Sequence, residues 1–289
     1  MKVSGFTIVR NAVKFDYPAV EAIQSILPLC DEMVVSVGAS EDDTLGLIRS
    51  INSSKIKIVE TVWNDSLREG GKLLAVETDK ALASISSDST WAFYIQADEV
   101  LHEKYIPVVG SAMEKWKNDK AVDGLLFNYT HFYGSYDYVA DSRKWYRKEI
   151  RVIRNDQSIS SWRDAISFRR RGEKLRVKPV DAHIYHYGWV KPPAAQQEKQ
   201  RSFHKMWHND EWMKKNIPAA AEFDYSNIDS LKKFSETHPA VMGNRISKKN
   251  WKFEHDLLLK KISPLNRILL LIEQLTGWRI GEYQNYRIV

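Results

Sequence analysis

The sequence predicts an α/β fold in which a mainly parallel sheet is flanked by helices and followed by a helical C-terminal extension. Short apolar segments with strand character alternate with helical segments through the first hundred residues. Beyond residue 100 this alternation gives way to a β-rich stretch, and a helical tail begins at about Ser247. Because β-α-β units make parallel sheets that bind ligands at the carboxyl ends of their strands, polar residues that follow the first strands are candidate site residues.

The first half contains alternating elements that carry local signals. Pro18 suits the first turn of a helix, where its missing N–H has no partner, and Asp42-Asp43-Thr44 offers side chains that cap the next helix. The predicted strands and helices, in chain order, are Val3–Val9, Pro18–Leu27, Met33–Val37, Thr44–Ile51, Ile56–Val59, Gly71–Ile85 and Trp91–Ile95.

The second half is less regular. Its predicted elements are the helix Ile106–Lys117, the strands Gly124–Tyr129, Glu149–Arg154 and Asp181–Tyr187, the helix Ala194–His208 and the tail helix Leu265–Leu275. We therefore divide the chain into two halves of one domain, residues 1–100 and 101–215, and a helical extension, residues 216–289.

The composition is that of a globular protein. With 289 residues, of which 43% are apolar, the chain can fill a substantial core. The single cysteine, Cys30, excludes an intramolecular disulfide, and no secretory signal pattern precedes the first strand, so we expect a cytoplasmic protein. The longest aliphatic run, Ile268–Ile272, is far shorter than the roughly 20 residues that cross a bilayer.

Positive charge is concentrated in one block. Between Arg143 and Lys178, thirteen Lys or Arg face four acids, a local balance of +9 in a chain whose net charge is +6. Such a block attracts phosphate-bearing partners, whether a nucleotide, a nucleic acid or an anionic lipid, or it is simply a solvated basic surface.

Two acids follow the fourth predicted strand in the segment WAFYIQADEV. A carboxylate at the end of a parallel strand is well placed to hold Mg²⁺ or Mn²⁺ against a diphosphate, because hard cations prefer oxygen ligands. Asp98 is the first metal candidate, and Glu99 the second because neighbouring side chains on extended backbone point in opposite directions. The alternative is that Asp98 only caps a helix or a turn.

Four short segments stand at the ends of predicted elements. TIVRNA ends the first strand, VGASEDDT follows the second, GGKLLAVE opens the third helix and IQADE follows the fourth strand. In order and spacing they resemble the nucleotide-sugar-binding half of bacterial family 2 glycosyltransferases, which have the Rossmann-like GT-A fold. The resemblance covers about residues 3 to 100, and more loosely extends to 190. It implies that residues 1–100 bind the donor and residues 101–215 the acceptor.

The resemblance carries over to named donor-site residues. It implies that Arg10 and Asn11 lie near the nucleotide, that Lys72 faces it, and that Gln96-Ala97-Asp98 replaces the usual Asp-x-Asp motif. Where the family places aspartates that contact a uracil ring, this chain has Val37-Gly38, so the base is left open. Lys72 also fits a solvent-facing helix position.

The resemblance further implies a catalytic base in the second half of the domain. An inverting transferase needs a carboxylate or histidine that removes the proton of the acceptor hydroxyl. Asp164, which follows the basic strand Glu149–Arg154, is the candidate base, and the alternative is an ordinary ion pair with Arg163 or Arg169. His186, followed by Tyr187 and Gly188, is expected to complete the metal site, although a lone histidine near a strand end is also often structural.

Aromatic residues crowd the segment 128–146. Aromatic faces suit sugar rings, so Tyr133, Tyr136 and Trp145, together with Arg163, are expected to bind the acceptor. The alternative is that the aromatic rings fill the core of the β-rich half.

These observations together predict a metal-dependent glycosyltransferase that moves a sugar from a nucleotide sugar to an acceptor hydroxyl with inversion, using Mg²⁺ or Mn²⁺. The resemblance implies a glycan or lipid-linked acceptor and a role in cell-surface glycan or polysaccharide synthesis. The tail rests on an anionic membrane at the inner face, or packs on the body or on another subunit. The alternatives are a sugar nucleotidyltransferase, which needs a Gly-rich loop that residues 10–13 lack, and a nucleic-acid-binding protein that uses residues 128–178. We do not expect a nucleic-acid partner, and an oligomer is compatible with the sequence.

Overall fold

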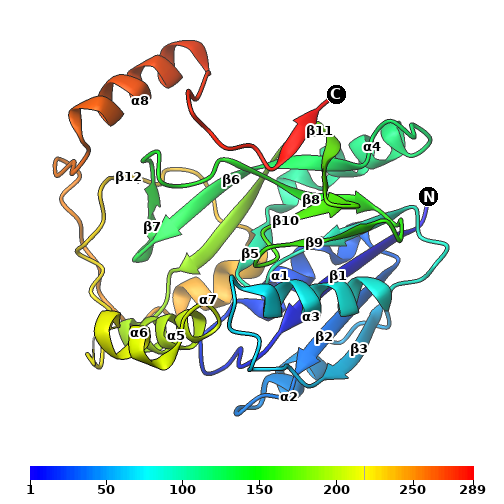
Figure 1. The fold of residues 1–289 in the computed structure, drawn as a ribbon, viewed down its shortest axis with the longest axis horizontal. Helices are drawn as coiled ribbons and strands as arrows, with labels where there is room; N and C mark the ends of the chain where they lie inside the picture. Colours follow the sequence, from blue (N-terminus) through cyan, green and yellow to red (C-terminus); the bar gives the residue numbers. More distant parts are fainter. Residues whose placement is uncertain (218) are drawn as a thin grey trace.

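Four apolar segments of the first hundred residues form the parallel part of a single sheet (Figure 1). The computed structural model describes residues 1–217 and 219–289. The sheet begins in the order β3-β2-β1-β4, and each neighbouring pair of these strands is parallel. The strands are β1 (Val3–Val9), β2 (Glu32–Gly38), β3 (Ile56–Thr61) and β4 (Trp91–Tyr94). Their carboxyl ends therefore lie at one edge of the sheet, as predicted.

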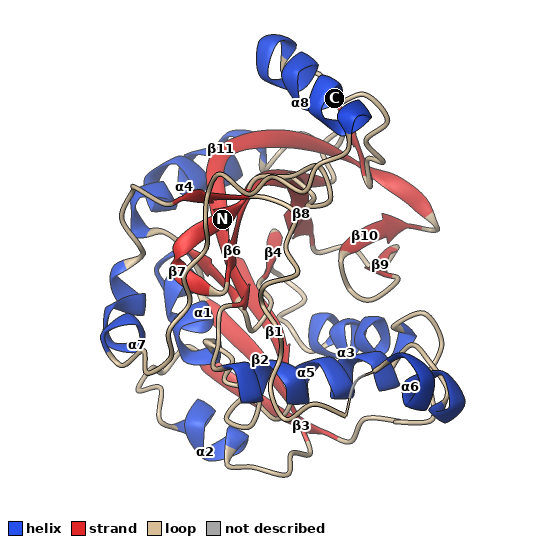
Figure 2. Cartoon of the chain, turned by 90° about the vertical axis from the view of Figure 1, so that its left-hand side faces the viewer, coloured by secondary structure: helices blue, strands red, loops and turns tan. Residues whose placement is uncertain are grey.

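Helices cover both faces of this parallel part (Figure 2). Ile23 of α1 and Val109 of α4 belong to the apolar core on one face, and Leu73 of α3 belongs to the core on the other. Asp43 caps α2 by accepting a hydrogen bond from a backbone N–H three residues further on. The helices are α1 (Ala19–Ile26), α2 (Thr44–Arg49), α3 (Lys72–Ala83) and α4 (Ile106–Trp116).

The second half extends the same sheet with a mixture of parallel and antiparallel pairs. β4 is followed in the sheet by β8, which is antiparallel to both β4 and β6, and the long β11 lies beyond β6 and runs parallel to it. The short β5 pairs with β11 so that Glu99 lies opposite His186. This pairing brings the acidic turn after β4 next to a histidine from the far half of the domain. The strands are β5 (Glu99–Leu101), β6 (Gly124–Tyr133), β8 (Lys148–Arg154) and β11 (Glu173–Trp189).

The predicted α/β class, with helices flanking the parallel strands and a helical C-terminal extension, is confirmed. The two remaining predicted helices are present as α5 (Pro193–Lys205) and α8 (Pro264–Thr276). Short elements that the sequence pattern did not reveal are β7 (Ser135–Ala140), β9 (Ile159–Trp162), β10 (Ser167–Arg170), β12 (Leu231–Lys233), β13 (Tyr286–Ile288), α6 (Asp210–Asn216) and α7 (Gly243–Ser247). Among the described residues, no helix has the length and apolar character needed to span a membrane.

Candidate active site

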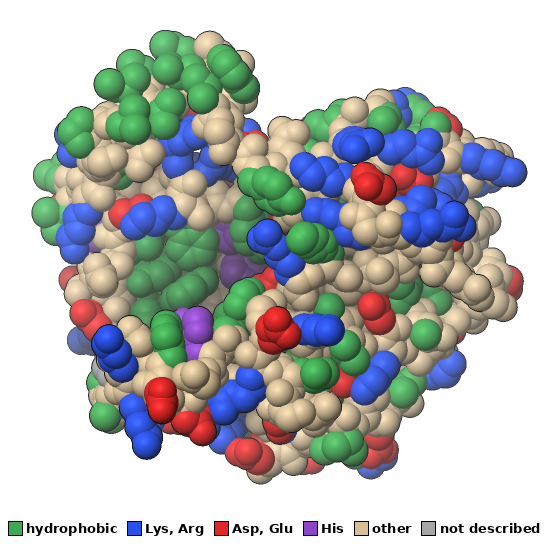
Figure 3. Space-filling model, viewed as in Figure 1, with side chains coloured by type: hydrophobic (Ala, Val, Ile, Leu, Met, Phe, Trp, Pro, Cys, Tyr) green, Lys and Arg blue, Asp and Glu red, His purple; other side chains and the backbone are tan. Residues whose placement is uncertain are grey.

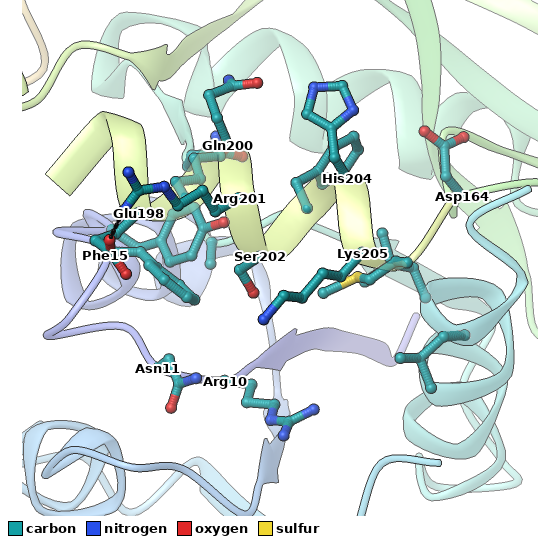
Figure 4. Close-up of a pocket in the computed structure, with 18 of the residues that line it drawn as sticks. Arg10, Asn11, Phe15, Asp164, Glu198, Gln200, Arg201, Ser202, His204 and Lys205 are labelled. Carbon is teal, nitrogen blue, oxygen red and sulfur yellow. Dashed lines mark hydrogen bonds and ion pairs between the residues drawn. The ribbon is translucent and has the colours of Figure 1, made fainter. Parts of the chain in front are cut away.

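A cleft of about 1160 Å³ opens at the carboxyl ends of β1 and β4. α5 crosses one side of the cleft, with Ser202 and Lys205 turned toward Arg10, and Asp164 lies at the right-hand side of the view (Figure 4). The space-filling view shows this face hollowed between α8 and the α5–α6 pair, with apolar side chains and histidines at the bottom (Figure 3). Seven of the predicted site residues line the cleft, namely Arg10, Asn11, Gln96, Ala97, Asp98, Asp164 and His186.

Asp98 and His186 face each other in the cleft. The imidazole Nε2 of His186 lies 3.8 Å from the carboxylate Oδ2 of Asp98. The approach depends on Gly188, because a Cβ at that position would lie 2.6 Å from the His186 ring and 2.7 Å from the Asp98 carboxylate. Burial lowers the pKa of His186, so this imidazole is neutral at pH 7.

A second histidine, His131 on β6, fixes which nitrogen of His186 carries the proton. His131 donates from Nε2 to the carbonyl oxygen of Tyr146 at 2.8 Å, and burial holds its pKa well below the ordinary value. In this neutral ring Nδ1 is an acceptor, and it lies 3.1 Å from Nδ1 of His186. His186 therefore donates from Nδ1, which leaves the lone pair of Nε2 directed at Asp98. A carboxylate and a lone pair that face each other are a natural pair of cation ligands.

Lys199 supplies positive charge to Asp98, and a second lysine, Lys191, lies in the interior, where burial lowers its pKa well below the ordinary value. Lys199 of α5 donates from Nζ to the Asp98 carboxylate at 3.1 Å and to the carbonyl oxygen of Gly188 at 2.9 Å. Lys191 is buried, and its Nζ binds the backbone carbonyl of Phe15 at 2.8 Å. Burial raises the pKa of Asp98, but the positive charge around it, that of Lys199 above all, outweighs burial and holds that pKa below its usual range. Asp98 is therefore ionised in the cleft.

Glu99, the neighbour of Asp98, points into the protein interior. Its carboxylate accepts two hydrogen bonds of 2.7 Å from the guanidinium of Arg151 and one of 2.7 Å from the hydroxyl of Tyr129. The side chains of Glu99 and Arg151 are fully buried. Arg151 also donates to the carbonyl oxygen of Ile166, two residues beyond Asp164, at 3.1 Å. This ion pair therefore supports both the acidic turn and the loop that carries Asp164.

Gln96 links the same two segments directly. Its side-chain amide donates to the carbonyl oxygen of Ala165 at 3.2 Å. A carboxylate at this position could not donate to a carbonyl. The amide in place of the usual first acid therefore has a physical reason in this chain: it ties the Gln96-Ala97-Asp98 turn to the residue that follows Asp164.

Asp164 lies in a strained turn. The residues on either side of it, Arg163 and Ala165, have φ values of 56° and 61°, in the left-handed region that non-glycine residues rarely occupy. Gly71 at the start of α3 packs against the Cβ of Asp164. Burial raises the pKa of Asp164, and no ion pair to it forms among the described residues. Strain of this kind concentrates at functional sites.

Arg10 and Asn11 join the loops that follow β1, β2 and β3. Arg10 makes a two-pronged pair with Asp65 and stacks over Trp63, with 5.5 Å between its guanidinium carbon and the ring centroid. Asn11 accepts a hydrogen bond from the backbone N–H of Glu41 at 2.8 Å. Trp63 is buried against Gly38, and its indole N–H has no partner among the described residues.

The other predicted residues lie away from the cleft wall. Lys72 is exposed at the first turn of α3, and Arg163 stacks on Trp162 at 4.7 Å and Tyr283 at 5.9 Å. The aromatic residues Tyr133, Tyr136 and Trp145 pack in two clusters in the β-rich half. Sequence reasoning did not single out His131, Lys199, Lys191, Arg151, Trp63 or Asp65. Their positions arise from pairings between distant segments. His131, Arg151 and Lys199 lie in segments that the sequence pattern did indicate, but nothing local marks them as site residues.

No protein-family model and no curated protein matches the chain. Among solved structures, the chain is similar to S. aureus TarS 1–349 in complex with UDP, with 16% identity over 70% of this chain and 64% of that chain and a TM-score of 0.42. Against a longer S. aureus TarS structure the chain spans 39% of that chain.

Two further structures are similar. One is 4-diphosphocytidyl-2C-methyl-D-erythritol synthase from Anaerococcus prevotii, with 11% identity over 66% of this chain and 91% of that chain and a TM-score of 0.40. The other is glucosyl-3-phosphoglycerate synthase from Mycobacterium tuberculosis in complex with Mn²⁺, UDP and phosphoglyceric acid, with 20% identity over 45% of this chain and 43% of that chain and a TM-score of 0.30.

Proposed function

We propose that this chain is a glycosyltransferase that passes a sugar from a nucleotide-sugar donor to an acceptor hydroxyl with inversion. The proposal rests on two groups that line one cleft. The first is an ionised carboxylate that faces an imidazole lone pair, and the second is a carboxylate in a strained turn that forms no ion pair among the described residues. Asp98 and His186 form the first group, and Asp164 is the second. A cation-binding pair beside a base is the arrangement that group transfer from a diphosphate needs.

The Asp98–His186 pair fits a divalent cation. One carboxylate oxygen and one imidazole nitrogen suit Mn²⁺ or Mg²⁺, and Mg²⁺ typically takes only one or two protein carboxylates while phosphates and water complete the shell. The described residues contain no group of three or more His, Cys, Asp or Glu side chains that could hold a metal, which agrees with a site completed by the donor. When bound, the cation would balance the charge that develops on the leaving diphosphate.

The side chains of the cleft give the donor phosphates further positive charge. Lys199 lies against Asp98, and Lys205 of α5 is turned toward Arg10 at the end of β1 (Figure 4). Lys199 occupies the Asp98 carboxylate; with a cation held there, Lys199 would be released from the carboxylate and would contact a phosphate of the donor. We therefore expect metal binding without nucleotide to be weak.

Asp164 is the proposed base. Burial raises its pKa, and a more basic carboxylate removes the proton of an alcohol more readily. The acceptor oxygen then attacks the anomeric carbon of the donor sugar from the face opposite the departing diphosphate, and the proton of the hydroxyl goes to the carboxylate of Asp164. Trp189 and Tyr146 line the cleft near His186 and provide aromatic surface for a glycan acceptor.

A thermal-shift panel of UDP-, GDP-, CMP- and dTDP-sugars, with and without Mn²⁺, tests the donor. One nucleotide sugar is expected to raise Tm in a metal-dependent manner, and Asp98→Asn is expected to abolish the metal dependence. A shift with free CTP and none with any nucleotide sugar would identify a nucleotidyltransferase instead. Salt-dependent retention on RNA, with no response to nucleotide sugars, would identify a nucleic-acid-binding protein.

Asp164→Asn tests the base. The rate of sugar transfer is expected to fall by about 10²- to 10⁴-fold, the usual contribution of a general base, while the nucleotide-dependent Tm shift stays unchanged. Asp181→Asn, an exposed residue of β11, is the matched control and is expected to keep the full rate. Full activity of both the Asp98 and the Asp164 variants would overturn the mechanism.

A further inference from the structure

The C-terminal helix α8 is attached to the protein by its polar side and turns its apolar side outward. Glu273 on the inner side forms ion pairs with Arg143 at 2.7 Å and with Arg147 at 3.0 Å. None of the residues of α8 is buried, and the outward side chains spaced three or four residues apart are exposed by more than half, namely Leu265 (66%), Ile268 (58%), Leu271 (55%) and Leu275 (77%). A surface helix of a globular protein normally shows the opposite arrangement.

Two exposed aromatic side chains stand in the segment between α8 and β13. Trp278, two residues beyond the end of the helix, is 66% exposed, and Tyr283 is 61% exposed. Trp and Tyr, with an apolar body and a polar edge, are the residues that favour the boundary between lipid and water. The apolar face and the two aromatic residues are hereafter called the α8 surface.

Basic side chains border the α8 surface. Tyr283 lies 4.7 Å from the ammonium of Lys174 and 5.9 Å from the guanidinium carbon of Arg163, measured to its ring centroid. No ion pair neutralises Arg163 or Lys174 among the described residues. In Figure 3 the apolar side chains of α8 cover the lobe at the upper left, and a group of Lys and Arg side chains lies at the upper right, across an indentation.

We propose that the α8 surface, with this basic border, binds to an anionic lipid surface. An amphipathic helix lies in the headgroup region with its apolar face buried, and each Lys or Arg near the surface adds attraction to anionic lipids. Charge decides between a membrane and a second copy of the chain. Two copies joined through α8 would bring two unneutralised basic borders together, whereas an anionic lipid surface complements them. The inference does not rest on the proposed function.

Vesicle co-sedimentation of the full chain tests the proposal. The probes are vesicles of equal parts phosphatidylcholine and phosphatidylglycerol, and vesicles of phosphatidylcholine alone. The protein is expected to bind the anionic vesicles, and to be released as salt is added, because surface charges are screened. It is expected to bind the neutral vesicles at least about tenfold more weakly, as the loss of several lipid–cation contacts implies. Absence of binding to the anionic vesicles would overturn the proposal.

Two variants separate the apolar and the basic contributions. Leu271→Glu is expected to weaken binding by at least about tenfold, because it removes apolar burial and adds a repelled charge. The matched control, Val108→Glu, changes an exposed apolar residue of α4 and is expected to leave binding unchanged. Lys174→Gln is expected to weaken binding by about fivefold, the effect of one basic side chain near an anionic surface.

The oligomeric state shows whether a second copy of the chain, and not a lipid surface, covers the α8 surface. Light scattering of the free protein is expected to give one mass for the wild type and for Leu271→Glu. A dimer that dissociates in the Leu271→Glu variant would assign the α8 surface to a second copy and overturn the proposal, as would vesicle binding that Leu271→Glu leaves intact. Nucleotide-sugar binding, measured by Tm shift, is read separately, so its failure would bear on the transferase proposal alone.

Discussion

Asp98 and Glu99 are neighbours in the chain, yet their surroundings differ completely. Asp98 faces the cleft, where its partners are a lysine side chain from another helix and an imidazole at 3.8 Å, both of which a ligand can displace or share. Glu99 faces the interior, where Arg151 and Tyr129 satisfy both of its oxygens. A buried acid is therefore a candidate ligand-binding residue when a ligand can replace its hydrogen-bond partners, and it has a structural role when its partners are fixed in the interior.

Glu149, two residues before Arg151, is an intermediate case. Its Oε1 accepts a hydrogen bond from Asn285 at 2.9 Å, but Oε2 has no hydrogen-bond partner within the described part of the chain. Burial raises the pKa of Glu149 to about 7, although Arg151 and Asn285 act in the opposite direction. With incomplete pairing, the interior favours the protonated form.

Breaking the interior pair is expected to have the largest effect on stability. Glu99→Ala leaves the Arg151 charge buried without a partner, which typically costs about 3–5 kcal/mol. Asp98→Asn is expected to cost less, because Lys199 keeps its bond to the carbonyl oxygen of Gly188. Urea unfolding of the two variants at pH 7 measures the difference. Equal losses of stability would show that Asp98 and Glu99 have the same structural role, which would contradict the assignment of Glu99 alone to the interior.

Glu149 is expected to make the stability of the protein depend on pH. Its folded-state pKa, about 7, lies above the ordinary value of 4.5, so the stability it contributes is fully present below pH 4.5 and is lost as the pH rises through 7. Glu149→Gln is expected to remove this loss, and to unfold at pH 8 with a free energy higher than that of the wild type by on the order of 3 kcal/mol.

The measurement is urea unfolding at pH 5 and pH 8. Glu173→Gln, at the exposed start of β11, is the control and is expected to follow the wild type. If Glu149→Gln and the wild type lost stability in parallel between the two pH values, Glu149 would not be the titrating group.

The smallest expected effect concerns the hydrogen bond behind His186. His131→Phe removes the acceptor that holds the Nδ1 proton of His186, so Nε2 no longer keeps its lone pair directed at Asp98. Loss of such a supporting bond commonly lowers metal affinity about 10- to 100-fold. Mn²⁺ titration in the presence of the preferred nucleotide measures the change. His183→Phe is the matched control, because His183 lies on β11, the strand that also carries His186. An equal loss of affinity in this control would show that His131 does not have this role.

The sequence predicted the first half of the fold closely because its signals are local. β1 has the predicted bounds Val3–Val9, and α2 begins at the predicted Thr44 because Asp43 caps it. The short strands β5, β9 and β10 went unrecognised, since a strand of three or four residues gains its definition from a partner far away in the sequence. The sequence left open whether the aliphatic run Ile268–Ile272 packs on the body, and in the structure Ile268 and Leu271 are more than half exposed. Composition alone cannot show which side of a helix faces the protein.

Site residues could be predicted from the sequence only where the residue type and its position after a strand were sufficient to indicate a role. Asp98 and Asp164 follow strands, and the structure brings both to the cleft. His131 acquires its place because the pairing of β6 with β11 sets it opposite His186, and such a register cannot be read from either strand alone. Aromatic content, finally, did not distinguish core from pocket: Tyr133 and Tyr136 pack in clusters of the β-rich half.

The hydrogen bond from Gln96 to Ala165 has a consequence for the order in which substrates bind. This hydrogen bond joins the turn proposed to contact the donor to the loop that carries the proposed base. A donor that fixes the position of Asp98 is therefore expected to fix that of Asp164 as well. We therefore expect compulsory-order kinetics, with the nucleotide sugar first and the acceptor second. The free nucleotide would then compete with the donor but not with the acceptor, a pattern that initial-rate measurements can recognise without any knowledge of the structure.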